Sequence, residues 1–104
     1  MRSYSVILPR RARQDIKDIY EYICYELEAP EAAESTLNAL ESSINSLESM
    51  PTRYPYVNDM VLAANGYRMV PVKNYLVFYT IQGEQVYVAR ILYVKRNWKA
   101  IITP

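Results

Sequence analysis

The clearest pattern of apolar and polar positions lies in the last third of the chain, between residues 67 and 98. Three runs of β-branched, aromatic and aliphatic residues are separated there by short polar breaks, which is the pattern of a small antiparallel meander. The middle run, Tyr75 to Ile81, is apolar on both faces apart from Thr80. We expect such a strand to be covered by helices on one side and by a further segment on the other.

Turn residues indicate where these strands lie in the sheet and how they are connected. Pro71 has no backbone N–H, so its strand is expected at an edge of the sheet. Gln82-Gly83-Glu84 predicts the tight connection between the second and third runs. Two short segments are less regular: residues 61–64 are interpreted as a short extra strand, and residues 98–102 as a terminal turn or helix that returns apolar groups to the sheet.

The first half of the chain changes from a period of two to one of three to four. Residues 3–8 predict a short strand that stops at Pro9. From Arg10 an apolar stripe predicts a helix of about four to five turns. Pro30 ends this helix and suits the first position of the next one. The charged face of the first helix is read as solvated and carries Arg11, Asp15, Lys17, Asp18 and Glu21; the apolar seam of the second carries Ala33, Leu37, Leu40, Ile44 and Leu47.

The resulting order of strand, helix, helix and three strands predicts an α+β fold in which a helical hairpin covers one face of a mostly antiparallel sheet. With 104 residues, of which 51% are apolar and 22% charged, there is room for one core, so residues 1–104 are expected to form a single domain. No run is long enough to span a membrane and no signal-peptide core follows the N-terminus. We therefore expect a cytoplasmic protein without a membrane partner.

The chain contains no histidine and a single cysteine, Cys24. The lack of histidine excludes Ser-His-Asp and Cys-His catalysis and the HExxH zinc site. One cysteine provides no disulfide framework and fits a reducing compartment. We predict neither a metal nor another cofactor, and any catalysis would depend on arginine, lysine, tyrosine or carboxylates.

The charge is unevenly distributed although the net charge is only +1. The second helix and the loop after it are acidic, whereas residues 67–104 carry one acidic residue, Glu84, and six basic ones: Arg68, Lys73, Arg90, Lys95, Arg96 and Lys99. Such a basic surface suits nucleic acid, a nucleoprotein or an acidic protein partner. Arg90 lies inside a strand and needs a partner or a hydrated face. It could bind a target, or it could pair with an acidic residue of the helices.

The short segments given below, in this order along the chain, resemble those of the RelE/ParE superfamily of toxins from bacterial type II toxin–antitoxin modules. The resemblance covers nearly the whole chain. It rests on the following segments: Tyr4-Ser5-Val6-Ile7-Leu8, Asp15-Ile16-Lys17-Asp18-Ile19-Tyr20-Glu21-Tyr22-Ile23, Pro30-Glu31-Ala32-Ala33, Leu47-Glu48-Ser49-Met50-Pro51, Gly66-Tyr67-Arg68, Asn74-Tyr75-Leu76-Val77-Phe78-Tyr79 and Arg90-Ile91-Leu92-Tyr93-Val94-Lys95-Arg96-Asn97-Trp98.

Two activities occur in this superfamily. RelE-like members are ribosome-dependent mRNA endonucleases, whereas ParE-like members trap DNA gyrase on cleaved DNA. In RelE-like nucleases the central strand typically carries an arginine where this chain has Leu76, and leucine offers no charge-assisted contact to a phosphate. This position favours the ParE-like branch. Tyr93, beside Lys95 and Arg96, indicates the opposite, because a tyrosine there could act as a base.

Three functions therefore stay open. The favoured one is a toxin that poisons DNA gyrase, with a target-binding surface formed by Arg90, Lys95, Arg96, Trp98 and Lys99. The alternative is a ribosome-dependent mRNA endonuclease, an enzyme with Arg68, Arg90, Tyr93 and Arg96 in its site. A third is a binding module of the same fold without toxicity. All three imply an antitoxin, expected at the strand edge near Pro71 or in the groove beside the helices, with Arg68 and Lys73 as contacts.

Overall fold

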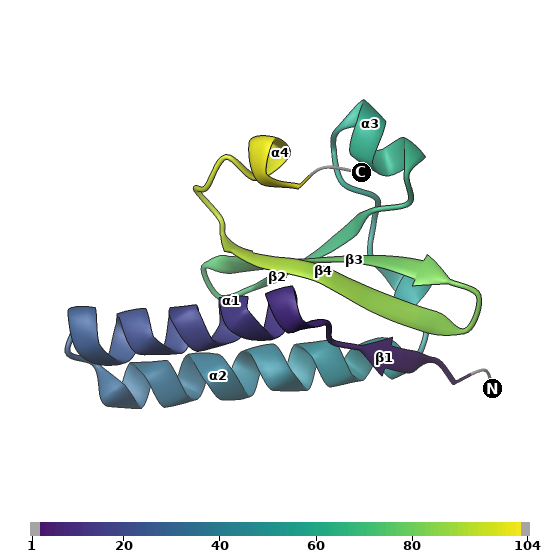
Figure 1. Ribbon diagram of the computed structural model, residues 1–104. Helices are drawn as coiled ribbons and strands as arrows, with labels where there is room; N and C mark the ends of the chain where they lie inside the picture. The colour runs from purple at the N-terminus through teal and green to yellow at the C-terminus, as the bar shows by residue number, and fades with distance from the viewer. Residues whose placement is uncertain (1–2, 103–104) are drawn as a thin grey trace.

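A four-stranded sheet divides the protein into two layers in the computed structural model, which describes residues 3–102. Helices α1 and α2 lie side by side on one face of the sheet, and the short helices α3 and α4 lie on the other (Figure 1). The elements in chain order are β1 (Ser5–Ile7), α1 (Arg10–Glu21), a π-helical turn (Tyr22–Glu26), α2 (Pro30–Asn45), two 3₁₀ turns (Ser46–Glu48 and Pro51–Arg53), α3 (Met60–Ala64), β2 (Arg68–Val72), β3 (Tyr75–Gln82), β4 (Gln85–Tyr93) and α4 (Trp98–Ile101).

The antiparallel meander expected from the sequence is confirmed. Strand β3 pairs antiparallel with both β2 and β4, and the sheet order is β1-β4-β3-β2. Strand β2, which contains Pro71, is at an edge, as its missing N–H predicted. Gly83 and Glu84 connect β3 to β4, with Gly83 at φ 63°, a left-handed conformation that glycine adopts without strain. The N-terminal strand β1 adds to β4 in parallel orientation, with Ser5 opposite Gln85.

The helical hairpin also follows the prediction. Pro30 occupies the first turn of α2, where its missing N–H costs nothing. The first helix ends in the wider π turn, in which the N–H of Leu27 donates to the carbonyl of Tyr22 at 3.1 Å. This turn leaves Tyr22, Tyr25 and Leu27 exposed at the tip of the hairpin.

Strand β3 is buried on both faces, because an apolar cluster covers each side of it. The cluster beneath the helices contains Ala12, Leu40, Ile44, Leu47, Val70, Val72, Val77, Tyr79, Val86, Val88 and Ile91. The cluster on the opposite face joins the sheet to the 57–62 segment and the C-terminal segment, and contains Val57, Leu62, Leu76, Phe78, Leu92 and Ile102. The expectation that a further segment covers the second face is therefore confirmed.

A β-bulge in β4 changes which residues face the helices. Val88 is opposite Tyr79 and Arg90 is opposite Phe78, so Ala89 is the extra residue of β4. Val88 and Ile91, three positions apart, then both lie in the helix-facing core. A regular strand would place residues three apart on opposite faces, so the bulge is what turns Ile91 toward the helices.

Two sequence expectations need correction. Residues 61–64 were interpreted as a strand, but they lie in helix α3, whose first turn is capped by the Asp59 carboxylate accepting from the N–H of Leu62 at 3.0 Å. The N-terminal strand is also shorter than residues 3–8, since β1 spans only Ser5–Ile7. The expected terminal helix is present as α4.

Candidate functional site

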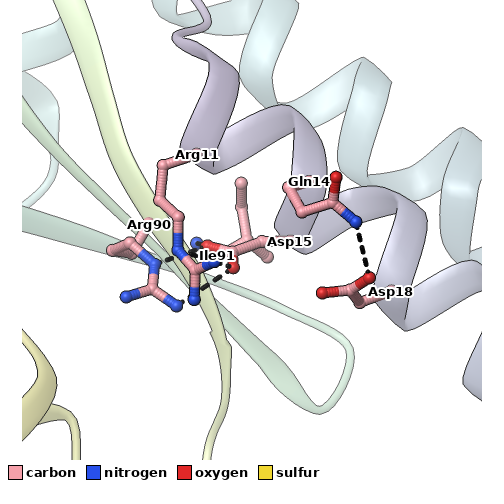
Figure 2. A network of polar contacts seen from close by, with 6 residues as sticks. All are labelled: Arg11, Gln14, Asp15, Asp18, Arg90 and Ile91. Atoms are coloured by element: carbon pink, nitrogen blue, oxygen red, sulfur yellow. Dashed lines mark hydrogen bonds and ion pairs between the residues drawn. The ribbon is translucent and has the colours of Figure 1, made fainter.

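Arg90, the strand arginine singled out in the sequence, is bound to helix α1 (Figure 2). The carboxylate of Asp15 accepts hydrogen bonds from Arg90 Nε at 2.7 Å and from Nη2 at 3.0 Å. The same carboxylate accepts a third bond, at 3.0 Å, from the backbone N–H of Ile91. Asp15 is 6% exposed and Arg90 15% exposed. Of the two interpretations of Arg90, the structure shows the ion pair with a helix.

Asp15 was read as part of a solvated helix face, and this was wrong. The signal for its burial was present, because Asp15 follows Ala12 by three residues and precedes Ile19 by four, which places it on the apolar stripe. A buried carboxylate is tolerated only with partners, and Arg90 and the Ile91 N–H supply them. Asp15 therefore fastens α1 to β4 instead of facing water.

The other basic residues at the end of β4 remain accessible. Lys95, Arg96 and Lys99 are exposed. The turn that carries them is held at its start by the N–H of Val94 donating to the carbonyl of Asn74 at 2.8 Å. Trp98 is only partly exposed, because its ring packs against Phe78 with centroids 5.5 Å apart. Three accessible cations therefore flank a partly buried tryptophan along the chain.

A pocket of about 740 Å³ opens between the end of α1, the start of α2 and the end of β4. Lys73, Tyr93 and Arg96 all line it, and Tyr93 is 41% exposed. The Tyr75 ring meets the Tyr93 ring edge-on at 5.8 Å between centroids. Burial, followed by the neighbouring phenols of Tyr93 and Tyr22, raises the pKa of Tyr75 above its ordinary value. The pocket therefore combines an aromatic wall with three cations, Arg11, Lys73 and Arg96.

Arg68 holds the chain before α3 in place. Its Nη1 donates to the carbonyls of Thr52 at 3.2 Å and Tyr54 at 2.6 Å. Its guanidinium carbon also lies 4.0 Å from the centroid of the Tyr56 ring. These contacts use the guanidinium to fix residues 52–56 against β2.

The four residues named for a nuclease site are not brought together. Tyr93 and Arg96 share the pocket, but Arg90 is engaged by Asp15. Arg68 is opposite Tyr79, which is opposite Val88, five residues before Tyr93. Five strand residues span about 16 Å at about 3.3 Å per residue, so Arg68 and Tyr93 lie toward opposite ends of the sheet. One phosphate could not contact all four side chains.

Leu76 stands at the position where RelE-like nucleases typically carry an arginine. Its side chain is 6% exposed and packs in the apolar cluster on the α4 face. Its neighbours there include Phe78 and Leu92. The position is covered by the C-terminal segment and offers a reactant neither charge nor access.

Neither a metal site nor a membrane span is found in the part of the chain that the structure describes. Within residues 3–102 no group of three or more Cys, Asp or Glu side chains is placed to hold a metal ion. No helix in this range is long and apolar enough to cross a membrane.

The fold consists of a parallel N-terminal strand, a helical hairpin and an antiparallel meander. This is the fold of the RelE/ParE class. A solved structure described as the chromosomal ParDE TA system from P. aeruginosa superposes with a TM-score of 0.74, at 19% identity, over 89% of this chain and 98% of that one. The family model described as the ParE toxin of the type II toxin-antitoxin system, parDE, matches residues 6–98. The chain belongs to this ParE toxin family. No curated protein matches it.

Proposed function

We propose that this chain inhibits growth by poisoning DNA gyrase and that a cognate antitoxin neutralises it. The observation that carries the choice of target is Leu76, which is buried among apolar side chains where a nuclease of this superfamily would present an arginine. The dispersal of Arg68, Arg90, Tyr93 and Arg96 supports the same choice, because phosphoryl chemistry needs several groups around one phosphate.

The proposed surface for the target is the exposed group Lys95, Arg96 and Lys99 beside Trp98. Lys99 Nζ lies 5.4 Å from the centroid of the Trp98 ring, and this ring packs against Phe78 in the apolar cluster on the α4 face. A cationic rim around an aromatic anchor suits a protein–DNA complex, in which charge guides association and the anchor provides buried area. Arg90, named for this surface as well, is proposed to act by holding β4 against α1.

Supercoiling and DNA-cleavage assays with purified gyrase test the proposal. We expect the wild-type protein to inhibit supercoiling and to accumulate cleaved DNA. The double variant Lys95→Glu/Lys99→Glu should weaken both effects at least about tenfold, because charge reversal repels DNA. The double variant Arg13→Glu/Lys17→Glu is the matched control, since it makes the same charge change at exposed positions of α1. Unchanged supercoiling at excess toxin would contradict the proposal.

A ribosome-dependent mRNA endonuclease is the second candidate, favoured by the presence of Tyr93 and Arg96 in one pocket. Primer extension on cellular transcripts after induction separates it from the first. Cuts positioned by codon would establish a nuclease, whereas intact mRNA in arrested cells would remove it. Undiminished growth on expression without an antitoxin would instead support the third possibility, a binding module without toxicity.

The antitoxin is proposed to bind in the pocket between α1 and the end of β4, where Lys73 is exposed. Arg68, the second residue predicted for this contact, does not line the pocket, and its guanidinium is engaged by the carbonyls of Thr52 and Tyr54 and by the Tyr56 ring. Coexpression with the protein encoded by the adjacent reading frame tests the pairing. We expect restored growth and a stable complex on purification.

A further inference from the structure

Strand β4 is only half covered along the edge that faces away from β3. Strand β1 pairs with Gln85, Val86 and Tyr87 and then ends. The remaining residues of β4, up to Tyr93, have no strand beside them on that side within residues 3–102. An uncovered edge exposes backbone donors and acceptors that can pair with another chain.

The hydrogen bonds identify which groups this edge presents. The Ile91 N–H donates to Asp15, so it points away from β3, and the Val94 N–H donates to Asn74, so it points back toward the β2–β3 turn. Backbone groups alternate sides along an antiparallel strand. Tyr93 therefore directs its N–H to the same open edge as Ile91.

Asp15 occupies one donor of the edge, and two further groups there have no hydrogen-bond partner among residues 3–102. At the Ile91 N–H, the Asp15 carboxylate accepts the hydrogen bond that the backbone carbonyl of a neighbouring strand would otherwise accept. The Tyr93 carbonyl is used by the N–H of Arg96 at 2.9 Å. The Ile91 carbonyl and the Tyr93 N–H remain, two residues apart on one edge. One residue of an added strand running parallel to β4, as β1 does, would bond to both.

Ile91 and Tyr93, the residues that carry these two groups, both line the 740 Å³ pocket. Ile19 and Ile23 of the hairpin provide apolar walls. The charged lining favours an acidic ligand. Lys73 and Arg96 are exposed cations, whereas the anion Asp15 is neutralised by Arg90 and Asp18 accepts a hydrogen bond from Gln14 at 2.8 Å.

The opposite edge of the sheet, at β2, offers much less. The Val72–Tyr75 pair closes the two-residue turn between β2 and β3, so alternation directs Met69 and Pro71 outward. The Met69 N–H already donates to the carbonyl of Pro55 at 3.4 Å, and Pro71 has no N–H. The edge near Pro71, expected from the sequence to receive the antitoxin, thus presents no unoccupied donor between Arg68 and Val72.

We propose that the uncovered edge of β4 at Ile91–Tyr93 is a strand-addition site for an extended, acidic segment of the antitoxin, with Lys73 and Arg96 binding its carboxylates. This inference rests on the proposed pairing with an antitoxin. It adds the edge used, the backbone groups that bond and the charge of the segment.

Backbone amide exchange measured by NMR tests the edge, with the protein alone and in complex with the product of the adjacent reading frame. We expect exchange of the Tyr93 amide to slow at least about tenfold in the complex. The Met69 amide, on the β2 edge, is the internal control and should change little. A stable complex in which Tyr93 exchanges as in the free protein would overturn the inference and leave the antitoxin pairing standing.

Charge reversal tests the acidic segment independently. Lys73→Glu/Arg96→Glu should weaken binding of the same partner at least about tenfold, while the control Arg13→Glu/Lys17→Glu should stay within about twofold. Spectra of the free variants verify folding. Full affinity in the pocket variant would overturn the assignment of an acidic ligand. A failure of the wild-type chain to form any complex would overturn both this inference and the proposed pairing.

Discussion

Asp15 and Arg90 are 75 residues apart in the sequence, yet the carboxylate of one binds the guanidinium of the other through two hydrogen bonds, at 2.7 and 3.0 Å. Asp15 lies in α1 and Arg90 in β4, and the third bond, from the Ile91 N–H, follows the β-bulge at Ala89. The pair therefore sets how the helical hairpin sits on the strand that borders the candidate pocket.

Removing one partner of this pair should be costly. Asp15→Ala leaves Arg90 without a counter-ion in a largely buried position and the Ile91 N–H without an acceptor, so we expect a loss of about 3–5 kcal/mol of unfolding free energy. Urea denaturation measures it. Asp18→Asn is the control, because Asp18 is exposed and should change stability by less than about 0.5 kcal/mol. Equal effects of the two variants would contradict the role given to Asp15.

A double-mutant cycle separates the ion pair from the remaining contacts. Asp15→Asn and Arg90→Met should each destabilise the protein, and the combined variant should lose less than the sum of the two. The coupling energy is expected to be about 1–3 kcal/mol, since the residues are in direct contact. Additive single effects would show that the two side chains stabilise the protein independently.

Leu76 should tolerate neither truncation nor charge. Leu76→Ala is expected to cost about 2–5 kcal/mol, because the cavity opens between Phe78 and Leu92 in a packed cluster. Leu76→Arg should cost more and should not create nuclease activity, since the C-terminal segment covers the site. Thermal denaturation and an RNA-cleavage assay provide the readouts. Val61→Arg, on the exposed side of α3, is the matched control and should leave the melting temperature nearly unchanged.

Because of Tyr79, the unfolding free energy is expected to depend on pH in the alkaline range. Its hydroxyl donates to the carbonyl of Pro51 at 2.5 Å, and burial raises its pKa to about 12 in spite of the nearby Arg68 and Arg53. The unfolded pKa is about 10. Because the folded pKa is raised, the stabilisation is complete below about pH 10 and is lost as the pH rises toward 12.

The variant Tyr79→Phe isolates this contribution. It should lower the unfolding free energy at neutral pH by about 1–2 kcal/mol, since the Pro51 carbonyl loses its donor. The difference between wild type and variant should then shrink between pH 10 and pH 12, in denaturant titrations at each pH. A difference that stays constant over this range would contradict the raised pKa.

Arg68 is expected to matter for folding more than Lys73. Arg68→Ala removes the hydrogen bonds to Thr52 and Tyr54 and should cost about 1.5–3 kcal/mol. Lys73→Ala, at an exposed turn position, should change stability by less than about 0.5 kcal/mol. Chemical denaturation compares the two. If Arg68→Ala left stability unchanged, the loop contacts would carry no weight and Arg68 would be available as a partner contact.

Local patterns predicted most of the fold. The three apolar runs of the C-terminal third, together with Pro71 and Gly83, were sufficient to predict the meander and its edge, and Pro30 marked the start of the second helix. These signals are readable because they depend on neighbours in the chain. The helix at residues 60–64 was missed, since five residues carry too little periodicity and its cap, Asp59, was not recognised.

The candidate site was predicted only in outline. The sequence indicated a basic C-terminal surface, and Lys95, Arg96 and Lys99 are indeed exposed. The pairing of Arg90 with a helix was one of two readings left open by the sequence, whereas the burial of Asp15 and the grouping of Lys73 with Arg96 in one pocket were not predicted. Each of these involves residues that are distant in the sequence and come together only after the sheet and hairpin have packed.

The sequence by itself determined the elements, their order and the lack of histidine chemistry, because propensity, period and composition belong to the chain. Only the tertiary structure decided which charges are neutralised and which strand edge is left open. Those outcomes depend on the parallel placement of the short strand β1 beside β4 and on the bulge at Ala89. The physical reason is that the neighbours in space determine whether a charge is neutralised or a backbone donor is bonded. The neighbours of β4 are α1 and β1, which are far from it along the chain.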